Sequence, residues 1–288
     1  MESISLQGYA KLNLALEVKG KRKDGYHEME MVMQSVSLSD TVKLKKMENG
    51  IFLSCNRMDV SCGSDNIAYR AAEKFFDFTK VLGGIKINLE KKIPFQAGMA
   101  GGSADAAAVL FGLNELYETK LSLPELCSLG LLLGADVPFC LVGGTAHVTG
   151  IGEKIASISS LPSCCFVIVK PQTGISTVTA FQKVDRCRTL QKVDVGGVLK
   201  GISAADLWGV ASAMCNTFEQ VTDLQEVFEA KRCMKEAGAI GALMSGSGSA
   251  VFGLFPDRAS AEMALGFFSG DSWESFLAEP VTCGVKIC

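Results

Sequence analysis

The chain has 288 residues, of which 48% are hydrophobic and 20% charged, and its formal net charge at pH 7 is -3. This apolar content allows a substantial core in one large domain or two of ordinary size, and it argues against a disordered chain. The slightly acidic balance argues against a nucleic-acid or anionic-membrane partner, because either would normally require a basic face.

The cysteines and the N-terminal pattern indicate the cellular compartment. The 11 cysteines are scattered, without a CxxC pair or a Cys/His ligand spacing, which favours reduced thiols. From Ser3 onward polar residues alternate with apolar ones, which is not the pattern of a secretory signal. The apolar stretch from Leu126 to Ala135 is too short to span a bilayer. We therefore expect a soluble, cytoplasmic protein.

The first segment has the clearest periodicity in the chain. Between Ile4 and Val18, apolar or small residues alternate with mostly polar ones, and this period of two predicts one or two half-buried strands. The alternation sets Lys11 and Asn13 side by side on one face of the strand. We expect that face to point away from the core.

A turn at Asp24–Gly25 leads through Tyr26 and His27 into a second extended stretch at residues 29–38. An imidazole beside an aromatic ring can hydrogen-bond to a planar base and stack on it, so this pair is a ligand-binding candidate. The other histidine, His147, alternates within a predicted strand, which favours a structural role. With only two histidines, a multi-histidine metal site is excluded.

The strongest functional signal is the glycine-rich segment Gly98–Ser103. It follows a helix that Ser64 and Asp65 can cap and a strand at residues 85–89, and it leads into an Ala-rich helix expected to start at Ser103. Glycines let backbone N–H groups approach a ligand, and the start of the helix adds free N–H groups and its positive dipole end. This pattern predicts an anion site suited to a triphosphate, although a tight turn would use the same residues. It is not a Walker A loop, because no lysine follows the last glycine.

Two further side chains are suited to chemistry. Asp136 comes just after a predicted helix, and Pro138 should hold Val137 in an extended conformation. A carboxylate in such a loop can accept a proton from a substrate hydroxyl, or it can simply stabilise the turn. Lys11 is unusual on a strand otherwise suited to burial, although a solvated strand lysine is the alternative.

The second half of the chain continues the mixed pattern. We expect a buried strand at residues 166–169, helices at 204–218, 224–237 and 259–268, and strands at 250–255 and 281–287. The small residues of the Ser245–Ser249 loop would let a second lobe approach the phosphate site closely. Strands and helices without regular βαβ alternation predict an α+β fold with two lobes. We expect the domains at residues 1–158 and 159–288.

Taken together, these segments resemble the GHMP kinase superfamily. The resemblance rests on residues 10–14, 24–27, 98–107, 134–139, 143–146 and 150–153, which follow one another in the expected order over nearly the whole chain. It implies a two-lobed fold with an N-terminal ribosomal-protein-S5-like nucleotide lobe and a C-terminal ferredoxin-like substrate lobe. The motifs are most similar to the branch that phosphorylates the 2-hydroxyl of 4-diphosphocytidyl-2-C-methyl-D-erythritol in the non-mevalonate isoprenoid pathway.

The resemblance also implies the ligands and the roles of individual residues. ATP and Mg²⁺ would be the cofactors, and a small molecule carrying a cytidine diphosphate group would be the substrate of a monomer or weak homodimer, with no nucleic acid or membrane involved. Lys11 and Asp136 would be the catalytic pair at the substrate hydroxyl. The ATP site would comprise Asn66 near the adenine and Gln96, Ala97, Gly98, Met99, Ala100, Gly101, Gly102 and Ser103 around the phosphates. The substrate site would comprise Asn13, Tyr26, His27, Val137, Pro138 and Phe181, with the three aromatic residues around the cytosine ring.

Two alternatives remain open at this point. Another kinase of the same fold could act on mevalonate, homoserine or a sugar, although Tyr26, His27 and Phe181 argue against it because such substrates need no aromatic clamp. A GHMP-like binding protein could hold ATP without transferring phosphate, although Lys11 and Asp136 are both present. A Ser-His-Asp hydrolase is disfavoured, because no serine lies in a GxSxG elbow.

Overall fold

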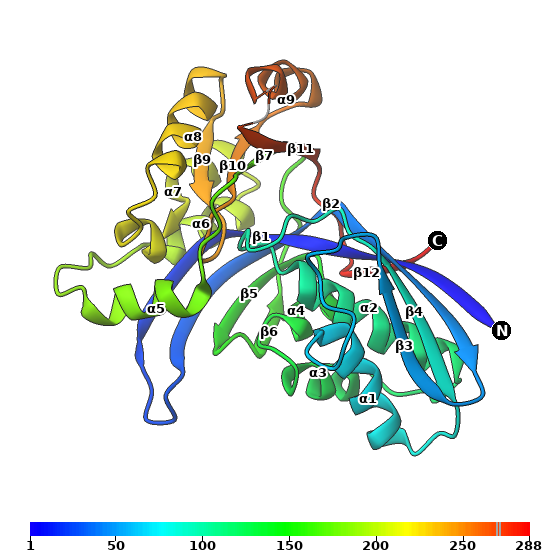
Figure 1. Ribbon diagram of the computed structural model, residues 1–288. Coiled ribbons are helices and arrows are strands. Elements are labelled where there is room, and N and C mark those ends of the chain that lie inside the picture. Colours follow the sequence, from blue (N-terminus) through cyan, green and yellow to red (C-terminus); the bar gives the residue numbers. More distant parts are fainter. Residues whose placement is uncertain (269, 271) are drawn as a thin grey trace.

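A long antiparallel hairpin crosses the molecule from one lobe to the other. Figure 1 shows it in a computed structural model that describes residues 1–268, 270 and 272–288. The hairpin consists of β1 (Ser3–Lys21) and β2 (His27–Met47), with Lys11 opposite Ser35 in the register. The strands expected from the period-two pattern are confirmed, and the second one is longer than expected.

The first sheet is built around this hairpin. Its strand order is β12-β1-β2-β4-β3, while β5 pairs with β2, β6 with β5, and β8 with β1. The bounds are β3 (Gly50–Cys55), β4 (Gly84–Glu90), β5 (Thr145–Gly150), β6 (Lys154–Ser157), β8 (Cys215–Asn216) and β12 (Val285–Ile287). Both β8 and β12 come from the second half of the chain, which therefore adds two strands to the first sheet. The domain boundary after residue 158 stays a prediction.

Helices α1 (Ile67–Thr79), α2 (Gly101–Leu116), α3 (Leu123–Leu131) and α4 (Val137–Val142) pack together in the first lobe. The central helix is α2, whose first turns are rich in alanine and lie directly against β1. A Cβ atom on Gly8 would lie 2.6 Å from the carbonyl oxygen of Ala104. Only glycine permits this approach. Strand β1 therefore packs closely against the start of α2, next to the glycine-rich loop.

The second lobe is a four-stranded antiparallel sheet covered by helices. Its order is β11-β7-β10-β9, from strands β7 (Cys165–Pro171), β9 (Gly241–Met244), β10 (Val251–Phe255) and β11 (Trp273–Ala278). The helices are α5 (Thr177–Arg186), α6 (Val195–Ser203), α7 (Leu207–Ala213), α8 (Gln225–Glu236) and α9 (Arg258–Leu265), with 3₁₀ turns at Thr217–Gln220 and Gly266–Phe268. Of these, α5 reaches back to the β1–β2 hairpin (Figure 1). None of the helices in the described ranges is both long and apolar enough to cross a membrane.

Several expected elements differ in the structure. Val137 is not extended but is the first residue of α4, since a proline in the first helical turn removes an N–H that would have no partner anyway. The N-cap of α1 is Asn66 rather than Ser64 or Asp65, because its side chain accepts a hydrogen bond from the N–H of Ala68.

The helix expected at residues 204–218 is broken. It is replaced by α7, the short strand β8 and a 3₁₀ turn, because Cys215 pairs with Ala15 of β1. Tertiary pairing thus overrides the local helical pattern. The expected last strand shortens to β12. Further elements that were not predicted are β3, β6, β9, β11, α4, α5 and α6.

Candidate active site

A cavity of about 580 Å³ opens at the segments that connect the lobes, and a second one of about 430 Å³ contains most of the predicted site residues. The smaller cavity lies between the lobes. The first lobe contributes Lys11, Asn13, Leu16, Met29, Met31, Met33, residues 91 and 93–103, Ala135, Asp136 and Ile151, and the second contributes Thr177, Phe181, Phe218, Gly246 and Ser247. The predicted site residues therefore gather in the smaller of these two cavities.

The glycine-rich loop presents an uncapped helix start to this cavity. Helix α2 begins at Gly101, two residues earlier than expected, and its N-cap Ala100 has no side chain that could cap it. Its first intrahelical bond runs from Ala104 to Ala100. The N–H groups of residues 101–103 have no hydrogen-bond partner among the described residues. An open helix start of this kind binds anions through its N–H groups and its dipole.

The loop is fixed in shape by residues of both lobes. Gln96, Gly98 and Ala100 have positive φ angles of 50°, 71° and 59°. The carbonyl of Gly98 accepts hydrogen bonds from Lys11 Nζ (2.7 Å) and Ser245 Oγ (3.0 Å), and the N–H of Lys11 donates to Met99. Strand β1 and the Ser245–Ser249 loop therefore both hold the turn.

Lys11 and Asn13 lie side by side, as expected, but the face that carries them is buried. Their exposed fractions are 4% and 0%, because the loop at Ser245, contributed by the second lobe, covers them. Lys11 Nζ donates to Asn13 Oδ1 at 2.6 Å. Asn13 Nδ2 is buried without a hydrogen-bond partner among the described residues, which is costly and leaves it available to an acceptor atom of a ligand.

Asp136 lies at the N-cap of α4 and lines the same cavity. Its carboxylate makes no hydrogen bond or ion pair with any described residue, Lys11 included, and it does not cap its helix. The carboxylate is therefore free to act on a ligand. Lys11, in contrast, is held by Asn13 and Gly98 and lines the same cavity as Asp136 without pairing with it.

Two of the predicted aromatic residues, His27 and Phe181, form a cluster with Phe218. The rings of His27 and Phe181 are stacked with centroids 4.4 Å apart and planes at 18°, and Phe181 meets Phe218 edge-on. Phe181 and Phe218 line the cavity, whereas the buried His27 and the 59% exposed Tyr26 do not. The aromatic surface that the cavity offers thus comes mainly from the second lobe.

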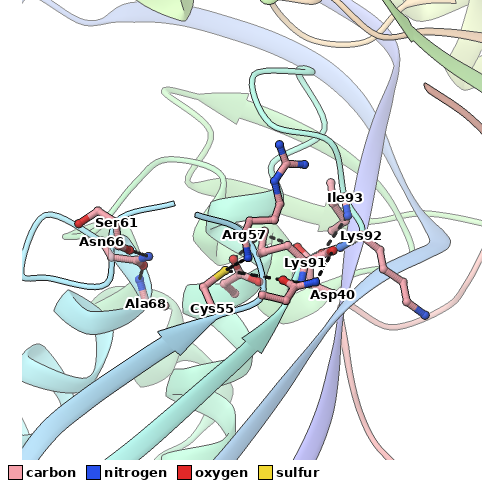
Figure 2. A network of polar contacts seen from close by, with 11 residues as sticks. Asp40, Cys55, Arg57, Ser61, Asn66, Ala68, Lys91, Lys92 and Ile93 are labelled. Carbon is pink, nitrogen blue, oxygen red and sulfur yellow. Dashed lines mark hydrogen bonds and ion pairs between the residues drawn. The ribbon is translucent and has the colours of Figure 1, made fainter. Parts of the chain in front are cut away.

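Three other predicted residues do not line the cavity. Val137 and Pro138 are buried in α4, and Asn66 uses its side chain to cap α1 and to donate to the carbonyl of Ser61 at 2.6 Å (Figure 2). Their assignment to ligand binding stays a prediction. Conversely, Thr177, Phe218 and the β2 residues Met29, Met31 and Met33 line the cavity without having been predicted. Their types and spacing resemble ordinary core positions, so the sequence held no signal for them.

An unexpected charged network anchors the base of the loop. The carboxylate of Asp40 on β2 accepts from the N–H groups of Lys92 (2.6 Å) and Ile93 (2.8 Å) and from Lys91 Nζ, as Figure 2 shows. Lys91 Nζ also donates to Asp105 of α2 at 2.5 Å. Burial alone would lower the pKa of Lys91, but the two carboxylates raise it overall. Through this network, Asp40 of β2 holds residues 91–93, which precede the loop, and Lys91 links them to Asp105 in the helix that follows it.

Comparison with known proteins identifies the family. Residues 66–144 match the GHMP kinases N terminal domain, and residues 224–269 match the GHMP kinases C terminal domain. The chain belongs to the GHMP kinase family and is an ATP-dependent small-molecule kinase with the expected two-lobed α+β fold.

Individual relatives are more specific. The chain is 41% identical over 283 residues to the 4-diphosphocytidyl-2-C-methyl-D-erythritol kinase of Acetivibrio thermocellus, covering 98% of this chain and 100% of the relative. A crystal structure of 4-(cytidine 5'-diphospho)-2C-methyl-D-erythritol kinase is 31% identical with a TM-score of 0.81, over 96% of this chain and 99% of the other. A homoserine kinase from Cytophaga hutchinsonii has a TM-score of 0.78 at 18% identity, with 100% and 98% coverage, which shows the shared fold alone.

Proposed function

We propose that the protein transfers the γ-phosphate of ATP to the 2-hydroxyl of 4-diphosphocytidyl-2-C-methyl-D-erythritol, as a step of non-mevalonate isoprenoid precursor synthesis. The observation that carries this proposal is that Lys11, Asp136 and the open start of α2 line one cavity. Near-full-length similarity to relatives named for this substrate supports the choice of acceptor. The cytoplasmic setting and the state of monomer or weak homodimer stay predictions from the sequence.

The backbone at the start of α2 would bind the nucleotide. The free N–H groups of residues 101–103 would hold the phosphates of ATP, and the anchored loop would keep these donors in place without rearrangement. Mg²⁺ fits this site because the hydroxyl of Ser103 offers an oxygen ligand, beside the phosphates themselves. When bound, the ion would neutralise phosphate charge. No group of three or more His, Cys, Asp or Glu side chains in the described ranges could hold a metal alone.

Phosphoryl transfer needs mainly positioning and charge stabilisation from the protein. Asp136, which is bonded to no described side chain, would accept the proton of the substrate hydroxyl as its oxygen attacks the phosphorus. Lys11, held by Asn13 and Gly98, would stabilise the charge that develops on the transferred group. The unpaired Nδ2 of Asn13 would donate to an oxygen of the acceptor.

The aromatic cluster would bind the base of the substrate. Phe181 offers its ring at the cavity wall, and His27, which is stacked against that ring but does not line the cavity, would bring a hydrogen-bonding group to the base. Tyr26 is exposed on the neighbouring turn and would close over the base. A substrate without a base would leave this apolar surface uncovered, which disfavours mevalonate, homoserine or a sugar.

Replacing Gly98 by alanine is expected to weaken ATP binding at least ~10-fold and to cost about 1–3 kcal/mol of stability. The φ angle of Gly98 is +71°, and a Cβ atom there would lie 2.0 Å from the carbonyl oxygen of Ser245. Calorimetric titration with ATP and denaturant unfolding measure the two effects. Gly134→Ala is the control, because its Cβ would meet only side chains at 3.6 and 3.7 Å. Unchanged ATP affinity in Gly98→Ala would contradict the assignment of the loop.

A turnover assay tests the proposed function itself. Purified protein, ATP and Mg²⁺ are offered the cytidine substrate in parallel with mevalonate, homoserine and galactose, while ADP release is followed and products are identified by phosphorus NMR. We expect phosphate on the 2-hydroxyl of the cytidine substrate alone. Turnover of another compound would support the kinase chemistry but contradict the proposed substrate. Tight ATP binding without any turnover would favour the non-catalytic alternative.

A further inference from the structure

Asn216 is a buried side chain that holds two segments of the chain together. It lies on β8, paired with Leu16 of β1, is 4% exposed and does not line the cavity. Its Nδ2 atom donates to the carbonyl oxygens of Met244 (2.7 Å) and Gly246 (2.8 Å), and its Oδ1 atom accepts from the N–H of Phe218 at 2.9 Å. Two carbonyls and one N–H fit the amide in a single orientation, so the direction of the side chain is fixed.

One of these hydrogen bonds reaches the wall of the active-site cavity. Phe218 lines the cavity and meets Phe181 edge-on, with ring centroids 5.0 Å apart. The 3₁₀ turn that carries Phe218 begins directly after Asn216, so the bond to Oδ1 caps this turn. Glu219 of the same turn accepts from the N–H of Met244 at 2.6 Å. The turn behind the aromatic wall and its cap therefore bind both the N–H and the carbonyl of Met244.

The other two hydrogen bonds lead to the glycine-rich loop. Met244 and Gly246 flank Ser245, whose Oγ donates to the carbonyl of Gly98 at 3.0 Å. A Cβ atom on Gly246 would lie 2.8 Å from the same carbonyl oxygen and 3.1 Å from Lys11 Nζ, so the backbone here packs directly on both groups. A continuous series of contacts therefore runs from the aromatic wall, through this one amide, to the glycine-rich loop.

We propose that Asn216 is a positioning residue that couples the two binding sites, so that the acceptor substrate tightens binding of the nucleotide and the nucleotide tightens binding of the acceptor. This inference rests on the proposed function, in which the acceptor packs on Phe181 and Phe218 and the nucleotide binds at the glycine-rich loop. An acceptor on Phe218 orders the turn at residues 217–220, and the amide of Asn216 carries this order to residues 244–246. The nucleotide then meets a loop that is already ordered and loses less conformational entropy on binding. Such coupling is reciprocal.

Asn216→Ser tests the coupling directly. A serine hydroxyl can still accept from the N–H of Phe218, because serine is a good cap, but it has no amide to donate to Met244 and Gly246. Calorimetric titration gives the Kd of a non-hydrolysable ATP analogue with Mg²⁺, alone and with saturating cytidine substrate. For the wild type we expect the acceptor to tighten nucleotide binding about 5–150-fold, the usual range of coupling between sites. For Asn216→Ser we expect this factor to fall below about 2.

Two controls separate coupling from structural damage. Asn88→Ser makes the same substitution at a half-buried asparagine of β4, whose amide donates to Ser54 Oγ away from the cavity. Ile168→Val trims a fully buried side chain on the opposite face of the second sheet from Met244 and should lower the unfolding temperature. Both variants should keep the coupling factor of the wild type. Loss of coupling in Ile168→Val as well would overturn the proposal, because general loosening of the lobe would then be sufficient.

Hydrogen exchange gives a readout that does not depend on the acceptor. Without any ligand, we expect Asn216→Ser to speed the exchange of the N–H groups of residues 244–250 by about 10-fold, the change in opening equilibrium expected from two lost hydrogen bonds. Exchange in α1, which lies in the other lobe, should stay unchanged. Exchange at the wild-type rate in residues 244–250 of Asn216→Ser would overturn the proposal.

The binding data distinguish failure of the coupling from failure of the proposed function. A wild-type protein that turns over the cytidine substrate but binds the two ligands independently would overturn the coupling and leave the function intact. A wild-type protein that neither binds nor phosphorylates this substrate would contradict the proposed function, and the coupling would fail with it, whereas the exchange data would still show whether Asn216 holds the loop. An Asn216→Ser variant with the coupling factor of the wild type would overturn the inference alone.

Discussion

Replacing Asp136 by asparagine is expected to lower kcat by about 10²–10⁴, the usual contribution of a positioned general base, while ATP affinity stays within a few-fold of the wild type. The side chain lines the cavity, caps no helix and makes no hydrogen bond or ion pair with a described residue. An amide of the same shape therefore removes the proton acceptor without removing a structural contact. The effect should be confined to the chemical step.

Single-turnover kinetics and calorimetric ATP titration separate the chemical step from nucleotide binding. Asp77→Asn, an exposed carboxylate on α1, is the matched control and should leave both quantities unchanged. Near-normal kcat in Asp136→Asn would exclude the proposed base. A large loss of ATP affinity would instead mean that this carboxylate acts mainly through the metal–nucleotide complex.

The parts of the site that lie on one segment could be predicted from the sequence. The period of two along β1 sets Lys11 beside Asn13, and the glycines before an Ala-rich helix predict the loop, because both depend only on local geometry. The burial of Lys11 could not be predicted. It depends on Ser245, more than 230 residues away, which covers a strand face that looks solvated in the sequence alone.

Dependence on distant residues also explains why the sequence pattern did not indicate two charged contacts. In the sequence Lys91 is simply a strand-end lysine, and Asp185 is one of many helical carboxylates. Each becomes specific only when the fold brings a distant partner to it, Asp40 in the first case and His27 in the second. Side-chain type and spacing carry no record of such pairings. Local motifs therefore predict which groups act, and the tertiary fold decides what holds them in place.

Replacing Lys91 by methionine is expected to destabilise the protein by about 3–5 kcal/mol at pH 8 and to weaken ATP binding. Lys91 Nζ is bonded to two carboxylates, Asp40 and Asp105, whose side chains are 0% and 5% exposed. Methionine fills a similar volume but leaves both acids without a cation. Because Asp40 also binds the N–H groups of residues 92 and 93, the repulsion should loosen the base of the phosphate loop.

The size of this effect should depend on pH in a defined direction. Burial raises the pKa of Asp105 to about 7, against the opposing effect of Lys91. An unfolded aspartate loses its proton near pH 4, so between about pH 4 and pH 7 the folded state binds more protons and stability falls as pH rises. Because Lys91 lowers the pKa of Asp105, removing Lys91 raises this pKa further, and stability then continues to fall to higher pH. The destabilisation should therefore be larger at pH 8 than at pH 5, where a proton on Asp105 replaces part of the missing charge.

Denaturant unfolding at the two pH values measures this difference. Lys43→Met is the matched control, since it removes an exposed ion pair with Glu90 and should cost less than about 1 kcal/mol at either pH. The double variant Lys91→Met/Asp105→Asn should recover stability at pH 8, because it leaves Asp40 as the single acid of the network. An equal loss for Lys91→Met at both pH values would show that the lysine acts through its packing rather than through its charge.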